Sequence, residues 1–458
     1  MRTAAAVAAT ASLLLACASC SSRPAALKGA PDGTYQGHAT YRGTRLGFSV
    51  RFRSDNDTLR AYFNSDDMLL LGQPLDSVRY ARPRIRFVTS GDHPLAFSGV
   101  VAGDSIVGEA NAPPVPGVID SAAAAGAERV RFTLRHAIVP PPPYATERVT
   151  FASSDSVRLE GTVYLPPAMP HTSPGVVILQ GSSSNLRHEY RFYADHFARA
   201  GFAVLVFDKR GKGESTGDYG TATYDDLAND AAAAVKCLRA QAQVVSARVG
   251  VWGLSQGAFI TPRVAARVDS LAFVVAVSPP GMTIGETAAY QDSVRLMQGG
   301  FGNEQAQKAA ALDRLILAWL SQRRGREVVE RELEHVADTP WRRASSLPHH
   351  LPHGETLEGW YWRGRTLDPL PGWRALKAPA LVVFGAADEL LPAGASATNI
   401  ARALAEGGNR DHTVKQFPAA NHVLLTLPLV AGGAWDWPRV APGYLDLVTQ
   451  WMTAHVKP

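Results

Sequence analysis

The chain has 458 residues, 46% of them hydrophobic, so it can bury large cores in two or more domains and is not a disordered protein. A formal net charge of +5 is spread along the sequence without a long Lys/Arg block, which argues against nucleic acid as a partner. The three cysteines provide neither a disulfide framework nor a cysteine-based zinc site.

Residues 1–20 are predicted to be a targeting segment. Arg2 gives a minimal positive region, and the apolar run at 4–16 is too short to span a bilayer. The run ends in Leu-Leu-Ala-Cys, which resembles the bacterial lipobox. We therefore expect export to the cell envelope or periplasm, with a lipid on Cys17 as a membrane tether. An ordinary signal peptide cleaved near Ala18 is the alternative.

Residues 32–137 predict a small all-β accessory domain. Short runs of alternating polar and apolar residues, such as 44–53 and 129–136, are separated by turn residues, which is typical of an antiparallel sandwich or barrel. The region contains no cluster of His, Asp and Ser that would indicate catalysis. Four consecutive prolines at 140–143 form a stiff, extended boundary to the second domain.

Residues 144–458 predict an α/β domain. After an opening hairpin come apolar runs typical of strands that are covered on both faces. These runs lie at 175–181, 202–208, 248–253, 271–278 and 380–385. Helical patterns fill the gaps, as at 191–201 and 226–240, so the spacing predicts a doubly wound, mostly parallel sheet.

The sequence Gly-Leu-Ser-Gln-Gly at 253–257 joins a buried strand to a helical pattern. A serine in such a turn has a strained backbone that exposes its Oγ above the carboxyl edge of the sheet. Glycines two positions before and after it are needed because a Cβ there would clash with the neighbouring strand and helix. Ser255 is therefore the candidate nucleophile.

A serine hydroxyl needs a base and an orienting carboxylate, and both follow Ser255 in the order acid, then histidine. Asp388 comes directly after the strand at 380–385, and His422 lies in a loop after a further strand pattern. Glu389 is the rival acid. The rival bases, which we assign to the surface, are His349, His350, His353 and His412.

The oxyanion of an acyl-transfer intermediate needs two fixed donors. We expect these to be the backbone N–H of Gln256, after the nucleophile, and that of Ser182, in the loop after the strand at 175–181.

The segments VVILQGSSSN, FDKRGKGESTGDY, GVWGLSQGAF, GAADELLP and ANH occur in the order found in α/β-hydrolases. The set resembles the bacterial serine esterase, acyl-thioesterase and serine-aminopeptidase-like group over about residues 145–456. The resemblance implies a triad of Ser255, Asp388 and His422 acting through an acyl-enzyme. The chain departs from many relatives in having Gln180-Gly181 where they have His-Gly. We interpret Asp208 and Arg210 of the second segment as parts of a structural turn.

Residues 279–372 interrupt the strand and helix alternation and predict an inserted helical cap, with helices at 311–324 and 326–337. We expect Trp319, Trp341 and Trp360 to pack within the core of this insertion.

The leading hypothesis is an exported serine hydrolase that cleaves small-molecule carboxylic esters. A peptidase or thioesterase with the same triad is the alternative. A peptidase would need an acidic site that binds the amino terminus of a peptide. Glu330, Glu332 and Glu334 are candidates for that site, although we interpret them first as a solvated helix face. A non-catalytic envelope binding lipoprotein is the third hypothesis. No motif indicates a metal or an organic cofactor.

Overall fold

The computed structural model describes residues 28–55, 58–90, 94–111, 129–153, 157–167, 172–183, 185–357, 360–426 and 436–457. The predicted targeting segment, including Cys17, lies outside these ranges. Within them, no helix combines the length and the apolar character needed to cross a membrane.

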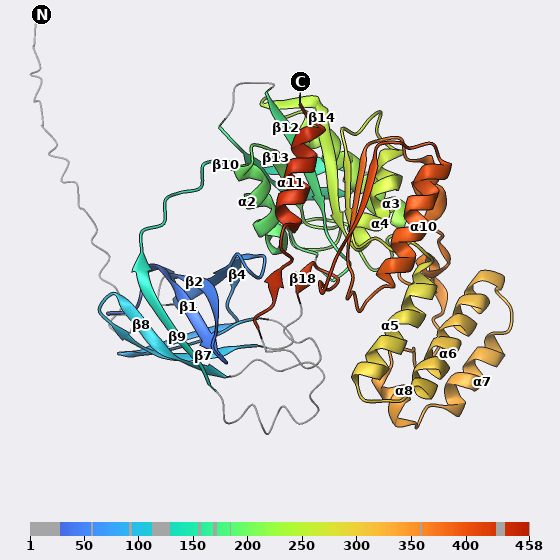
Figure 1. The fold of residues 1–458 in the computed structure, drawn as a ribbon, viewed down its shortest axis with the longest axis horizontal. Coiled ribbons are helices and arrows are strands. Elements are labelled where there is room, and N and C mark those ends of the chain that lie inside the picture. Colours follow the sequence, from blue (N-terminus) through green and yellow to red (C-terminus); the bar gives the residue numbers. More distant parts are fainter. Residues whose placement is uncertain are drawn as a thin grey trace, which may run out of the picture.

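The amino-terminal unit is one sheet of nine strands in the order β4-β3-β2-β1-β9-β8-β7-β6-β5. Its strand pairs are antiparallel. The strands are β1 (Gly33–Tyr41), β2 (Thr44–Asp55), β3 (Thr58–Ser65), β4 (Leu70–Pro74), β5 (Ser77–Ala81), β6 (Arg84–Val88), β7 (Ala96–Ala102), β8 (Ser105–Asn111) and β9 (Arg129–Ala137). The expected all-β unit is thus present, as a half-barrel formed by a single curled sheet (Figure 1).

Alternation along the strands explains why this sheet curls around a core. In β2, Leu46, Phe48, Val50 and Phe52 are buried, whereas the residues between them are half-buried or exposed. The rings of Phe87 on β6 and Phe97 on β7 stack with centroids 4.8 Å apart. The inner face is therefore aromatic and buried, and the outer face meets solvent.

The second sheet has eight strands in the order β10-β11-β13-β12-β14-β15-β16-β17. Pairs from β13 to β17 are parallel, and the opening hairpin joins antiparallel to β13. The strands are β10 (Ala145–Ala152), β11 (Arg158–Leu165), β12 (Ser173–Leu179), β13 (Ala203–Phe207), β14 (Val244–Leu254), β15 (Val274–Val277), β16 (Ala380–Gly385) and β17 (His412–Phe417). The predicted doubly wound, mostly parallel α/β-hydrolase sheet is confirmed.

Helices cover both faces of this sheet (Figure 1). Side chains of α3 (Tyr224–Arg239), α4 (Gln256–Ala265) and α10 (Ala393–Glu406) share one buried cluster with one face of the strands. Side chains of α2 (Arg191–Arg199) and α11 (Tyr444–Ala454) share a second cluster with the other face. In β12, Val177 and Leu179 belong to the first cluster and Val176 and Ile178 to the second, which explains the unbroken apolar run in the sequence.

A helical insertion separates β15 from β16 and forms its own bundle beside the sheet (Figure 1). It comprises α5 (Ile284–Gln298), α6 (Asn303–Gln322), α7 (Arg326–His335), α8 (Pro340–Ala344), η3 (Gly354–Leu357), η4 (Arg363–Thr366) and α9 (Leu370–Ala375). Trp319 and Trp341 pack in its core, as expected. Trp360 does not pack in this core. It packs against the first cluster of the α/β domain, with the centre of its ring 5.3 Å from that of Tyr219.

The remaining elements are η2 (Arg187–Tyr190) and the small strand pair β18 (Leu425–Thr426) and β19 (Arg439–Val440).

The half-barrel and the carboxyl-terminal part of the chain each bury a side chain in the core of the other. Leu69, from the turn between β3 and β4, belongs to the second cluster of the α/β domain, and Trp437, near the carboxyl end, belongs to the core of the half-barrel. The backbone N–H of Val440 donates to the carbonyl of Asp67 at 2.6 Å, and Arg439 forms an ion pair with the Asp67 carboxylate at 2.5 Å. The two units are therefore locked together by segments far apart in sequence.

We expect Trp437→Ala to destabilise this junction by about 3–5 kcal/mol, because it deletes a large buried side chain that is only 2% exposed. Thermal unfolding followed by circular dichroism should show a lower midpoint, with a smaller loss for Trp437→Phe. Equal midpoints for wild type and both variants would contradict this account of the junction.

Candidate active site

Ser255 occupies the turn between β14 and α4, and its backbone is strained. Its φ of 54° and ψ of −113° lie outside the region favoured by residues with a Cβ. The backbone N–H of Ser255 donates to the carbonyl of Val277 at the end of β15, at 2.8 Å, which fixes the turn against the neighbouring strand. The predicted sharp turn is thus present at the carboxyl edge of the sheet.

Two glycines make the turn possible. A Cβ on Gly253 would lie 2.5 Å from the backbone of Gly257 in α4, and a Cβ on Gly257 would lie 2.1 Å from the carbonyl oxygen of Leu179 in β12. Both distances are far below a van der Waals contact. The two glycines therefore allow the helix to start directly against the strands, as the sequence pattern predicts.

His422 and Asp388 form a buried pair at the same edge. Nδ1 of His422 lies 2.7 Å from Oδ2 of Asp388, and the two residues are only 6% and 4% exposed. The other carboxylate oxygen accepts from the backbone N–H groups of Leu390 and Leu391, at 2.8 and 3.0 Å. Asp388 is therefore held as an acceptor on both oxygens, and its contact with Nδ1 fixes the orientation of the imidazole.

Ser278 connects the histidine loop to the nucleophile turn. It follows β15 with a φ of 49°, it is fully buried, and its hydroxyl donates to the carbonyl of His422 at 2.8 Å. Its neighbour Val277 accepts the hydrogen bond from Ser255. Because β14, β15, β16 and β17 are adjacent and parallel, Ser255, Asp388 and His422 all emerge at one sheet edge.

The loop after β12 lies against Ser255. A Cβ built on Gly181 would be 3.6 Å from the Cβ of Ser255. The N–H of Gly181 donates to the Tyr190 hydroxyl at 2.7 Å, so it is already engaged. The next N–H, that of Ser182, is the one we expect to face an oxyanion, together with that of Gln256 in the first turn of α4, where N–H groups lack intrahelical partners.

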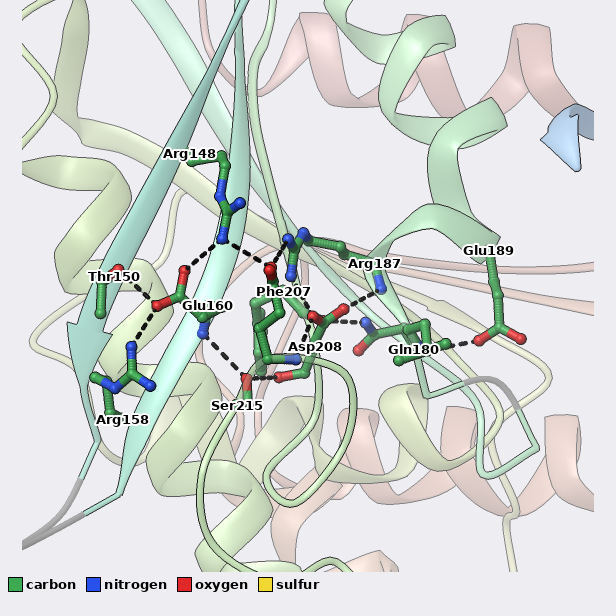
Figure 2. A network of polar contacts seen from close by, with 12 residues as sticks. Arg148, Thr150, Arg158, Glu160, Gln180, Arg187, Glu189, Phe207, Asp208 and Ser215 are labelled. Atoms are coloured by element: carbon green, nitrogen blue, oxygen red, sulfur yellow. Dashed lines mark hydrogen bonds and ion pairs between the residues drawn. The ribbon is translucent and has the colours of Figure 1, made fainter. Parts of the chain in front are cut away.

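The charged loop after β13 supports the loop after β12 (Figure 2). The Asp208 carboxylate accepts from the backbone N–H of Arg187 at 2.8 Å and pairs with the Arg187 guanidinium, which also pairs with Glu214. The amide of Gln180 donates to the carbonyl of Phe207. The buried side chain of Gln180 therefore links the end of β12 to the end of β13 through a hydrogen bond.

Arg210 of the same loop forms a bidentate pair with Asp230 of α3, both contacts at 2.7 Å. Gly211 and Gly213 adopt positive φ values of 68° and 54°. The contacts of Asp208 and Arg210 are those of a structural turn, in line with the interpretation made from the sequence.

The rival candidates lie elsewhere or lack the geometry. No contact places the Glu389 carboxylate on an imidazole nitrogen of His422, and burial raises the pKa of Glu389. His349, His350 and His353 are exposed, and Nδ1 of His412 is 2.8 Å from the carbonyl of Asn409. Glu332 and Glu334 are exposed on α7, and Glu330 pairs with Arg326 at 2.9 Å.

Sequence reasoning missed several residues that contact this site. Ser278 follows an apolar run and precedes two prolines, which gave no sign of a buried hydroxyl. Lys209 and Tyr219 stand in the charged loop that we interpreted only as a turn, yet both reach Gln256. The hydroxyl of Tyr290 in α5 donates to the carbonyl of Asp388 at 2.9 Å, so the insertion touches the acid loop.

These groups together can carry out acyl transfer: a half-buried hydroxyl in a strained turn, an imidazole oriented by a buried carboxylate, and backbone donors for an oxyanion. Within the described ranges, no cluster of three His, Cys, Asp or Glu side chains has the arrangement of a metal site.

A family model described as X-Pro dipeptidyl-peptidase (S15 family) matches residues 155–414 of the chain. Among solved structures, an esterase of Pyrococcus furiosus, Pf2001, is 20% identical, with 69% of this chain and 95% of that chain covered and a TM-score of 0.43. The hypothetical protein PA2218 of Pseudomonas aeruginosa is 19% identical, with 69% and 96% covered and a TM-score of 0.45. No curated protein sequence matches the chain significantly.

We expect Gly257→Ala to displace the nucleophile turn, because the added Cβ would overlap the Leu179 carbonyl. Such overpacking against backbone should cost at least about 1–3 kcal/mol and abolish labelling of Ser255 by a fluorophosphonate. The matched control is Gly394→Ala at the start of α10, where an added Cβ meets nothing within 4 Å. It should be neutral or slightly stabilising. Normal labelling of Gly257→Ala would contradict the assigned role of the glycine.

Proposed function

Because the chain belongs to the S15 family and is a serine hydrolase of the α/β fold, we propose that Ser255, His422 and Asp388 form its catalytic triad. We propose further that its substrates are small-molecule carboxylic esters. The observation that carries the proposal is the buried pair between His422 Nδ1 and Asp388 Oδ2, 2.7 Å apart, at the sheet edge where Ser255 emerges in a strained turn.

In the proposed mechanism, His422 Nε2 takes the proton from Ser255 Oγ as the oxygen attacks the acyl carbon of the ester. The oxyanion receives hydrogen bonds from the N–H groups of Gln256 and Ser182. When the tetrahedral intermediate collapses, His422 gives the proton to the leaving alkoxide and an acyl-enzyme remains. Water, deprotonated by His422, then attacks the acyl carbon and releases the carboxylic acid and Ser255.

Asp388 stabilises the imidazolium that forms in each half-reaction. Its second oxygen is fixed by two backbone N–H groups, so the carboxylate cannot rotate away from His422. This arrangement supports a role in orientation and charge stabilisation, with the proton remaining on the histidine.

The acids of the insertion support the ester over a peptide. Asp313 pairs with Arg365 at 2.7 Å, Asp292 accepts from Ser346, and Glu330 pairs with Arg326. These three carboxylates have partners inside the insertion, which supports the ester. Asp292 and Asp313 lie beside each other in its buried core, and Glu332 and Glu334 on α7 are exposed. The description of the matching family favours the second candidate, a peptidase that uses the same triad.

The insertion acts in this proposal as a cap that shapes the acyl pocket. Tyr290 and Gln291 of α5 donate to the carbonyls of Asp388 and Leu390, at 2.9 and 2.8 Å, so α5 is attached to the loop that carries the acid.

Export and a lipid tether at Cys17 complete the proposal, and they rest on the sequence pattern alone. Loss of membrane association on Cys17→Ser in fractionated cells would be the expected result.

The function is tested by labelling the purified protein with a fluorophosphonate and by assaying p-nitrophenyl acyl esters of increasing chain length beside an X-Pro p-nitroanilide. We expect labelling and ester hydrolysis in the wild type and neither in Ser255→Ala or His422→Ala, because both groups are needed to form the acyl-enzyme. Faster turnover of the anilide would instead favour the peptidase. A folded wild type that neither labels nor cleaves either substrate would favour the binding lipoprotein.

Two matched variants separate the roles of the neighbouring acids Asp388 and Glu389. Asp388→Asn should lower kcat by about 10⁴, because the amide no longer holds the productive imidazole tautomer. The matched variant Glu389→Gln should retain kcat within about tenfold. Steady-state kinetics with one ester decides, and the reverse ranking would transfer the orienting role to Glu389.

A further inference from the structure

Lys209 is a buried lysine directly beneath the candidate oxyanion loop. It is 6% exposed, and its ammonium donates to the carbonyl of Gly181 at 2.6 Å and to Oε1 of Gln256 at 2.7 Å. It also lies 5.0 Å from the centre of the Tyr219 ring. One side chain therefore bridges the loop after β12 and the residue after the nucleophile.

We propose that Lys209 is a positioning residue of the oxyanion hole: its ammonium polarises the Gly181–Ser182 peptide and fixes Gln256, so that both backbone donors are oriented and strengthened. This inference rests on the proposed function and deepens it. Lys209 acts through other groups and does not touch the substrate.

The physical basis is that Gly181 C=O and Ser182 N–H belong to the same peptide unit. A charged donor on the carbonyl oxygen draws electron density from the amide nitrogen, so the N–H at the other end becomes a stronger donor. The charge of Lys209 thus reaches the Ser182 N–H without any direct contact between them. The effect is largest in a buried site, where water does not screen the charge.

The second half of the hole is held through the Gln256 side chain. Its Oε1 accepts from Lys209 and from the Tyr219 hydroxyl, the latter at 2.9 Å. Because Gln256 is the first residue of α4, fixing its side chain also restrains the N–H that follows Ser255. An apolar residue at position 209 would remove the hydrogen bonds to Gly181 and to Gln256 together.

The charge on Lys209 is sensitive to pH. Burial lowers the pKa of Lys209 to about 7, and the Glu189 carboxylate partly opposes that shift. Asp230 lines the same small cavity beside Lys209, but both of its oxygens are bound by Arg210. Below the pKa the ammonium is present; as the pH rises through about 7 the proton is lost, and the polarisation weakens.

The first test is the pH dependence of kcat with one ester for wild type, Lys209→Met and Lys209→Arg. We expect wild-type kcat to fall as the pH is raised through about 7. Lys209→Met should have a kcat about 10- to 100-fold lower at acidic to neutral pH, little change in KM, and no loss across that range. Lys209→Arg should recover part of kcat and also lack the fall, because arginine stays charged.

The matched control is Tyr219→Phe, which removes another donor to Gln256 and a 3.4 Å contact with the carbonyl of Ser182, but leaves the charge and the contact with Gly181. It should keep the wild-type fall in kcat near the pKa of Lys209. A folded Lys209→Met with wild-type kcat, or with the same fall in kcat, would overturn the proposal. So would a fall that is lost equally in Tyr219→Phe.

A second measurement does not depend on activity or on the stability of the position-209 variants. In Ser255→Ala, NMR can follow the Lys209 side-chain carbon and the Ser182 amide during a pH titration. We expect the two signals to move with one common midpoint. A Ser182 amide signal that does not shift as Lys209 titrates would overturn the inference. A wild type that neither turns over the ester nor reacts with the fluorophosphonate would instead overturn the proposed function.

Discussion

The site depends on three backbone segments that approach one another without side chains between them. Gly257, in the first turn of α4, packs against the carbonyl of Leu179, and Gly253, near the end of β14, packs against Gly257 itself, each where an added Cβ would overlap backbone atoms. This close approach forces Ser255 into a positive φ and places it beside Gly181. Ser255 and the loop after β12 are therefore positioned by main-chain packing, which is rigid because it leaves no rotamer to change.

The order of the strands explains why these segments meet. The chain passes from β12 to β13 on one side and then to β14 on the other, so the connections after β12 and β14 leave the sheet edge in opposite directions. Such a reversal of strand order is where open α/β sheets bind their ligands. Asp388 and His422 reach the same edge from β16 and β17, and Ser278 ties the histidine loop back to β15.

The helical insertion and the half-barrel differ in which part of the α/β domain they contact. The insertion contacts the candidate active site, because Tyr290 is hydrogen-bonded to the carbonyl of Asp388. The half-barrel instead shares buried side chains with the α/β domain through Leu69 and Trp437. Trp360 was expected in the core of the insertion, but it packs beside Tyr219, because local sequence does not reveal which of two cores a tryptophan joins.

The sequence by itself determined the sheet, the sharp turn at Ser255 and the positions of Asp388 and His422 after strands, because unbroken apolar runs, paired glycines and polar residues at strand ends are local patterns. Only the tertiary structure decided that Asp388, and not Glu389, meets the imidazole, and that Lys209 lies under Gly181 and Gln256. Adjacent acids have the same local pattern, and a lysine in a charged loop is indistinguishable from a solvated one. What separates them is the direction of a side chain relative to segments far away in sequence, and that direction is fixed only when the strands pack into one sheet.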